Sequence, residues 1–239
     1  MPVEFLTDEQ AARYGRFVEG PSRADLDRLC FLDDADRELV ARRRGDVSRL
    51  GFALQLVTVR SLVTFLPDPL DVPTAVLDFV AEQLGIADPS RVKGYVERRT
   101  TRFEHAAEIA RERGYREFSI VEAELRGWVR DLAWTTGDGP RLIFDAAAGW
   151  LRERLVLLPG VSTLTRLVAT ERDAATKRLW ETLTALLTSE QACRLDSLLV
   201  VPEGARSSML EELRSGPRTV SGRGMVKALH RCPSWPVSA

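Results

Sequence analysis

Three short basic stretches of the sequence carry side chains that can bind nucleic acid. Arginine and lysine neutralise phosphate groups, and arginine also pairs with the edge of guanine. The first stretch is an arginine triplet, the second is RVKGYVERRTTR at residues 91–102, and the third is SGPRTVSGRGMVKALHR near residue 220. The candidate DNA-contacting residues in them are Arg42, Arg43, Arg44, Arg91, Lys93, Arg98, Arg99, Arg102, Arg218, Arg223 and Lys227.

Each basic stretch also has an ordinary structural interpretation. The arginine triplet precedes Gly45 and fits the end of a helix, where cations offset the helix dipole. The window 91–102 combines its cations with Tyr95 and a single acid, Glu97, which favours DNA contact, although a short exposed helix would look similar. Ser221 can begin a helix that enters a major groove or is simply terminal. The residues alone leave these alternatives open.

Residues for catalysis or metal binding do not form a recognisable motif. The cysteines Cys30, Cys193 and Cys232 are far apart, and His105 and His230 have no ligand-like neighbours. The loop TTGDGP lacks the following Gly-Lys-Ser/Thr of a phosphate-binding loop. Paired acids lie in amphipathic segments as caps or solvated faces. We therefore predict no enzyme activity, no metal and no cofactor.

Composition indicates an ordinary soluble globular protein. The 239 residues are 44% hydrophobic and 29% charged, with a net charge of −1 despite 34 lysines and arginines. The near-neutral charge means that DNA binding would depend on local clusters rather than on the whole chain. The start of the chain does not resemble a signal peptide, and no apolar run is long enough to cross a membrane. We expect a cytoplasmic protein.

The run Asp46–Leu66 must position much of the rest, because it is apolar on nearly every face. A helix that is apolar all round is normally buried, and the run is too long for a strand. Gln55, Thr58 and Arg60 interrupt it. We therefore predict a central buried helix that ends before the breaker PDPLDVP.

Most other segments also have helical periodicity, and no clear strand is present, which predicts an all-α fold of many helices. Capping boxes are predicted at Thr7 with Gln10 and at Ser119 with Glu122. Trp134, Trp150 and Trp180 have apolar neighbours and are predicted as core anchors. The glycines and proline of residues 135–140 suggest a boundary between two DNA-binding-like helical modules, 1–136 and 138–232, followed by a tail, 233–239.

Long collinear strings carry a resemblance to a known family. PVEFLTDEQAARYGRF, FLDDADRELVARRRGD, RRRGDVSRLGFALQL, TFLPDP and FVAEQLGI resemble the N-terminal region of replicative transposases of the Tn-three family. The similarity continues through GWLRERLVLLPG, LDSLLVVPEGAR and LRSGPRTVSGRGMVKAL, to about Leu229. That region is often described only as a domain of unknown function.

The resemblance implies a helical DNA-binding region that recognises the terminal inverted repeats of a transposon as double-stranded DNA. It also implies that the ribonuclease-H-like catalytic domain, with its acidic metal-binding triad, lies beyond the matched region. The tail HRCPSWPVSA departs from the family, so we expect a truncated fragment that lacks catalysis. The alternative is a helical interaction or assembly module that docks on a full-length transposase, or an inactive relic.

Overall fold

The computed structural model describes residues 5–17, 20–97 and 99–214, and every regular element in these ranges is helical. The prediction of an all-α fold is therefore confirmed. Within the same ranges, one isolated β-bridge pairs Arg116 with Val156. The elements are α1 (Asp8–Arg13), α2 (Arg23–Asp25), the π-helical turn η1 (Leu26–Cys30), α3 (Asp34–Ala41), α4 (Asp46–Leu62), α5 (Thr74–Gln83), the 3-10 turn η2 (Pro89–Val92), α6 (Lys93–Val96), α7 (Arg99–Arg113), α8 (Phe118–Thr135), α9 (Pro140–Glu153), α10 (Val161–Ala185), α11 (Ser189–Ser197) and α12 (Met209–Arg214).

Contacts between residues divide the chain into two units, 1–177 and 178–239, and each is described by itself. The boundary predicted near residue 137 lies in the connection between α8 and α9, two helices of the first unit that pack on each other. The division into two DNA-binding modules at that connection stays a prediction.

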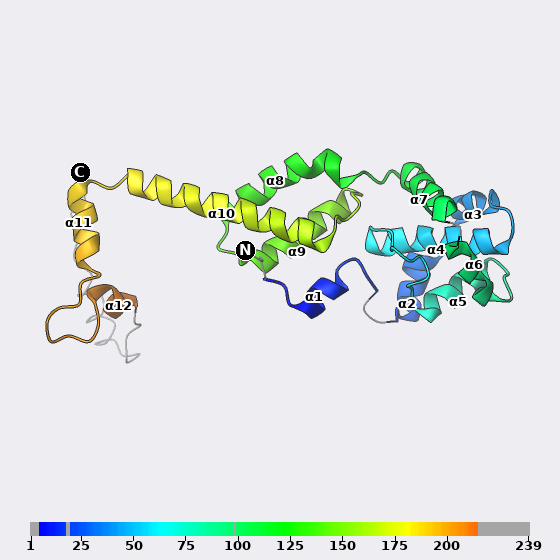
Figure 1. The fold of residues 1–239 in the computed structure, drawn as a ribbon, viewed down its shortest axis with the longest axis horizontal. Helices are drawn as coiled ribbons and strands as arrows, with labels where there is room; N and C mark the ends of the chain where they lie inside the picture. Colours follow the sequence, from blue (N-terminus) through cyan, green and yellow to red (C-terminus); the bar gives the residue numbers. More distant parts are fainter. Residues whose placement is uncertain (1–4, 18–19, 98, 215–239) are drawn as a thin grey trace. The chain divides into compact units, whose positions relative to one another are not determined.

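Helix α4 is the centre of the first unit, as its apolar sequence predicts. Every residue from Leu50 to Val59 is buried. Helices α3, α5, α6 and α7 and the turns η1 and η2 all pack against α4, drawn in cyan in Figure 1. The helix ends at Leu62, earlier than predicted, because Val63 adopts a left-handed conformation with φ 56°.

The predicted helix starts have mixed outcomes. The capping box of Thr7 and Gln10 is present, with the Gln10 N–H donating to the Thr7 hydroxyl at 3.2 Å. The predicted box of Ser119 with Glu122 is wrong, because α8 already begins at Phe118. Its N-cap residue, Glu117, makes no side-chain capping bond. Glu122 instead accepts from the Arg126 guanidinium at 2.8 Å.

A second core in the first unit lies between α8, α9 and the first half of α10. It contains Leu125 of α8, Ile143 and Leu151 of α9 and Leu164 of α10, all fully buried. Val63, directly after α4, belongs to this second core, and its carbonyl accepts the Leu158 N–H at 2.9 Å. The end of the central helix is therefore joined to the second core.

The described part of the second unit, residues 178–214, contains the end of α10, α11 and α12, and its apolar side chains are largely exposed. Trp180 is 61% exposed, and Leu183 and Leu186 next to it are also exposed. The core role predicted for Trp180 is therefore wrong. In the first unit, Trp150 is buried as predicted, whereas the core role predicted for Trp134 is wrong, because this side chain is 39% exposed. Among the described helices, none is long and apolar enough to span a membrane.

Candidate nucleic-acid interface

The arginine triplet is divided by the end of α3. Arg42 caps this helix, and Gly45, with φ 76°, turns the chain into α4. Arg42 and Arg44 are exposed and have no partner among the described residues. Arg43 points inward instead: its guanidinium lies 2.5 Å from Glu108 and 4.6 Å from the centre of the Phe52 ring. Two of the three arginines are thus available to a phosphate, while the third already holds α7.

The second basic stretch begins at η2, where buried and exposed residues alternate. Val92 and Tyr95 are buried and fix η2 and α6 to the core, whereas Arg91 and Lys93 are exposed. Neither cation has a partner in the part of the chain that the structure describes. The turn itself is fixed by Asp88, whose carboxylate accepts the Ser90 hydroxyl at 2.6 Å.

Both pairs of exposed cations lie on segments that adjoin the first turn of α4. A Cβ added to Gly94 would lie 3.9 Å from Cγ1 of Val47, so α6 contacts α4 in its first turn. Arg44 lies three residues before Val47 in the chain, and Lys93 directly precedes Gly94. The free N–H groups and the dipole at a helix start also favour anions. Asp46 lies in the same turn, but Arg49 pairs with it at 3.6 Å.

The structure describes the other predicted DNA-contacting residues only in part. Arg102 is half-buried, and its guanidinium lies 5.2 Å from the centre of the Phe103 ring. Arg99 opens α7, and its side-chain position is not described. The other predicted contacts, Arg98, Arg218, Arg223 and Lys227, lie outside the described residues.

A buried hydrogen-bond network fastens the second basic stretch to α4. The Gln55 side-chain amide donates to the Tyr95 hydroxyl at 2.7 Å and to the Arg102 carbonyl at 3.2 Å. The Tyr95 hydroxyl lies 2.7 Å from Nδ1 of His105. The Tyr95 ring packs so closely on Gly51 that a Cβ there would lie 2.3 Å from Cγ of Tyr95. Burial raises the pKa of Tyr95, so its hydroxyl stays protonated.

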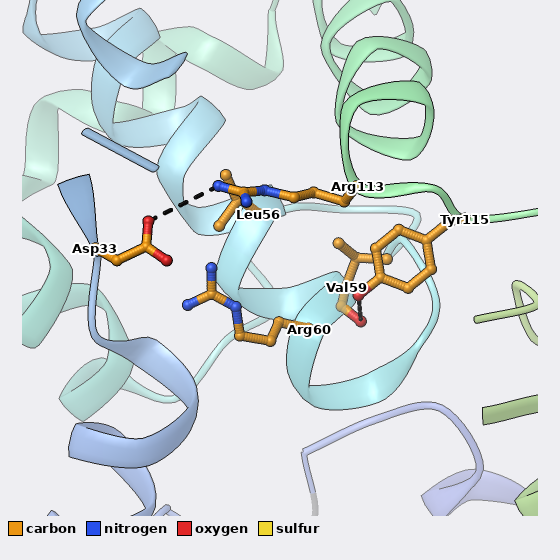
Figure 2. A pocket seen from close by; sticks show the side chains of 6 residues that line it. All are labelled: Asp33, Leu56, Val59, Arg60, Arg113 and Tyr115. Atoms are coloured by element: carbon orange, nitrogen blue, oxygen red, sulfur yellow. Dashed lines mark hydrogen bonds and ion pairs between the residues drawn. The ribbon is translucent and has the colours of Figure 1, made fainter. Parts of the chain in front are cut away.

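Arginines at the far end of α4 hold the fold together and are not free to bind a ligand. A pocket of about 260 Å³ lies there. Figure 2 shows Arg60 and Arg113 among the side chains that line it. The carboxylate of Asp36, which is fully buried, binds both guanidinium groups, with Arg60 at 2.5 Å. Arg60 also donates to the Phe31 carbonyl at 2.7 Å. Together with Asp33, which lies 4.0 Å from Arg113, the acids offset both positive charges.

A similar cluster stabilises the second core. Glu171 on α10 is buried, and its carboxylate accepts from Arg126 at 3.0 Å and from Arg130 at 2.6 Å, both on α8. Neither buried carboxylate was singled out from the sequence. A usable signal was present for one of them, because Arg60 interrupts an otherwise apolar helix and such a residue needs a buried partner.

Comparison with known proteins identifies the family. Residues 5–170 match the family model described as "Domain of unknown function (DUF4158)". The chain belongs to this family. It is also 44% identical over 233 residues to the transposase for transposon gamma-delta of Escherichia coli (strain K12), covering 97% of this chain and 23% of that protein. Likewise, it is 32% identical to the transposase for transposon Tn501 of Pseudomonas aeruginosa, covering 90% of this chain and 22% of that protein.

A third relative is the transposase for transposon Tn1546 of Enterococcus faecium, 29% identical over 95% of this chain and 23% of its own length. These relatives confirm the resemblance to the N-terminal region of Tn-three family transposases. The chain spans less than a quarter of the length of the curated relatives that it matches.

Proposed function

We propose that this chain binds double-stranded DNA at the terminal inverted repeats of a transposon. The observation that carries the proposal is a set of four exposed cations whose side chains have no partner among the described residues. Arg42 and Arg44 precede α4, and Arg91 and Lys93 lie on the segment that packs beside its first turn. Phosphate contacts of this kind fix a protein on a duplex. The relatives are transposases, which must recognise the ends of their element. In this proposal, DNA cutting and joining belong to the part of a transposase beyond the matched quarter.

The test is a fluorescence anisotropy titration of the chain with an inverted-repeat duplex from a related transposon and with a scrambled duplex. Each titration is made at two salt concentrations. We expect tighter binding to the inverted repeat. We also expect that changing all four cations to Ala weakens binding to both duplexes and lowers the salt slope by about 0.9 for each phosphate that is no longer neutralised.

A matched control removes four other exposed arginines, each paired with an acid three or four residues away: Arg13, Arg28, Arg141 and Arg194. This control changes the net charge equally but leaves the first turn of α4 intact, so affinity should stay close to that of the natural chain. Equal losses of affinity in the two quadruple variants would reduce the proposal to general electrostatic attraction. Absence of binding to either duplex would overturn it.

A second candidate function is docking on a full-length transposase, and the exposed apolar row of the second unit favours it. Leu179 and Leu183 lie four residues apart near the end of α10, Leu186 follows directly after the helix, and Trp180 lies beside Leu179 in the chain. Such a row is typical of a helix face that binds a partner. Binding of labelled chain to a purified relative transposase should disappear when Leu183 and Leu186 are changed to Asp. Unchanged binding would exclude this surface.

A further inference from the structure

The buried network at His105 is compatible with only one protonation state of the imidazole. The Tyr95 oxygen accepts a hydrogen bond from the Gln55 amide, so its own proton points to Nδ1 of His105. Nδ1 must then accept, which requires a neutral imidazole with its proton on Nε2. The ring is packed between Phe52, at 5.1 Å edge-on, and Tyr95, at 5.6 Å stacked.

Protonation of His105 would break the hydrogen bond between the Tyr95 hydroxyl and Nδ1 of His105. A proton on Nδ1 makes it a donor, so the Tyr95 hydroxyl would face two donors and lose the acceptor for its own proton. The new charge would also be buried, because His105 is only 6% exposed. Glu108 is an acid that would favour the charge, but Arg43 already pairs with that carboxylate at 2.5 Å.

The network is also what holds the second basic stretch in place. Gln55 lies on α4, Tyr95 on α6 and His105 on α7, and the Gln55 amide bonds the Arg102 carbonyl as well. Lys93 lies two residues before Tyr95, and Arg91 lies four residues before it. Releasing Tyr95 would therefore free the cations that are proposed to contact phosphate.

We propose that His105 is a proton-sensing positioning residue: when it gains a proton, Tyr95 leaves the network and the basic stretch loses its fixed position on DNA. The inference rests on the proposed DNA-binding function. It makes DNA binding by this chain sensitive to mild acid, through a residue that does not itself touch the duplex.

The direction of the effect follows from the surroundings of the imidazole. Burial is the largest influence and lowers the pKa of His105, the nearby Arg43 lowers it further, and Glu108 opposes both. An exposed histidine has a pKa of about 6.5, so the released state takes up the proton at higher pH than the buried state. The free energy that favours the closed network over the released state is therefore at its full value above about pH 6.5, and it decreases as the pH falls below that value.

The experiment measures the ratio of DNA affinities at pH 7.5 and pH 5.5, at constant ionic strength and with the inverted-repeat duplex. The natural chain should bind more weakly at pH 5.5, with a loss of at most about tenfold per pH unit for one proton. His105→Gln retains an acceptor for the Tyr95 hydroxyl but does not titrate, so its ratio should move close to one. The other histidine, His230, lies in the third basic stretch, so His230→Gln measures how much of the ratio comes from that stretch instead.

Binding that does not weaken at pH 5.5, or a His105→Gln variant with the natural ratio, would overturn this inference while the proposed function stands. Absence of binding at pH 7.5 would instead overturn the proposed function. In that case, NMR titration of the natural chain without DNA still tests whether protonation of His105 releases Tyr95. The inference requires protonation of His105 and loss of Tyr95 amide protection at the same pH, and separate transitions would refute it. The same titration replaces the variant if His105→Gln does not fold.

Discussion

Asp36 shows how single residues carry the fold of this protein. Its carboxylate is fully buried on α3 and is bound by Arg60 of α4 and Arg113 of α7. A buried ion pair contributes little compared with apolar packing, but removing one partner leaves the other charges uncompensated. The network is therefore more sensitive to substitution than its modest net contribution suggests.

We expect Asp36→Asn to lower the free energy of unfolding by roughly 3 to 5 kcal/mol, because two arginines would lose their buried counter-charge. Urea unfolding followed by circular dichroism measures this change. The neighbouring Asp34→Asn is a suitable control, since Asp34 is exposed in the same turn. Similar small effects for both variants would show that Arg60 and Arg113 find other partners.

At the scale of elements, the sequence predicts the helices well and their orientation less well. The apolar run at residues 46–66 is sufficient to predict α4 as the buried centre, since a helix that is apolar on nearly every face is normally covered. The inward position of Arg43 could not be predicted, because it depends on where α3 ends and on Glu108, 65 residues further along. The sequence assigned Trp180 to a core because periodicity defines a helix face but does not show whether anything covers that face.

The close contact between α4 and α6 gives a prediction about Gly51. A methyl group at this position would lie 2.3 Å from the Tyr95 ring, so Gly51→Ala should force the helices apart and destabilise the fold by about 1 to 3 kcal/mol. Gly127→Ala is the matched control, because this helical glycine has open space where the methyl group would lie. There the better helix propensity of alanine should stabilise by up to about 1 kcal/mol. Thermal unfolding of both variants would show opposite shifts, and shifts of the same sign would contradict the packing.

At the scale of the whole molecule, the chain contains one well-packed unit and a second unit that exposes apolar side chains. In residues 1–177, helices from distant parts of the sequence share two cores. In the described part of the second unit, leucines at regular helical spacing are in contact with solvent. The free energy of unfolding should therefore depend strongly on the first half of α10 and only weakly on its exposed end.

We expect Leu167→Ala, in the second core, to destabilise the protein by roughly 2 to 5 kcal/mol, because it leaves a cavity. The same change at Leu183, later on the same helix, should alter stability by about 0.5 kcal/mol or less, since that side chain is already exposed. Calorimetric unfolding of the two variants checks the contrast. A large loss of stability at Leu183 would mean that its face is covered in solution.

The burial of α4 has a consequence for synthesis on the ribosome. The partners of this helix include α5, α6 and α7, all of which follow it in the chain, and α7 ends roughly 50 residues after α4. At about 5 to 20 residues per second, translation therefore leaves this long apolar segment uncovered for several seconds. During that interval the nascent chain presents a strong binding site for chaperones, and the first unit can close only when α7 has left the exit tunnel.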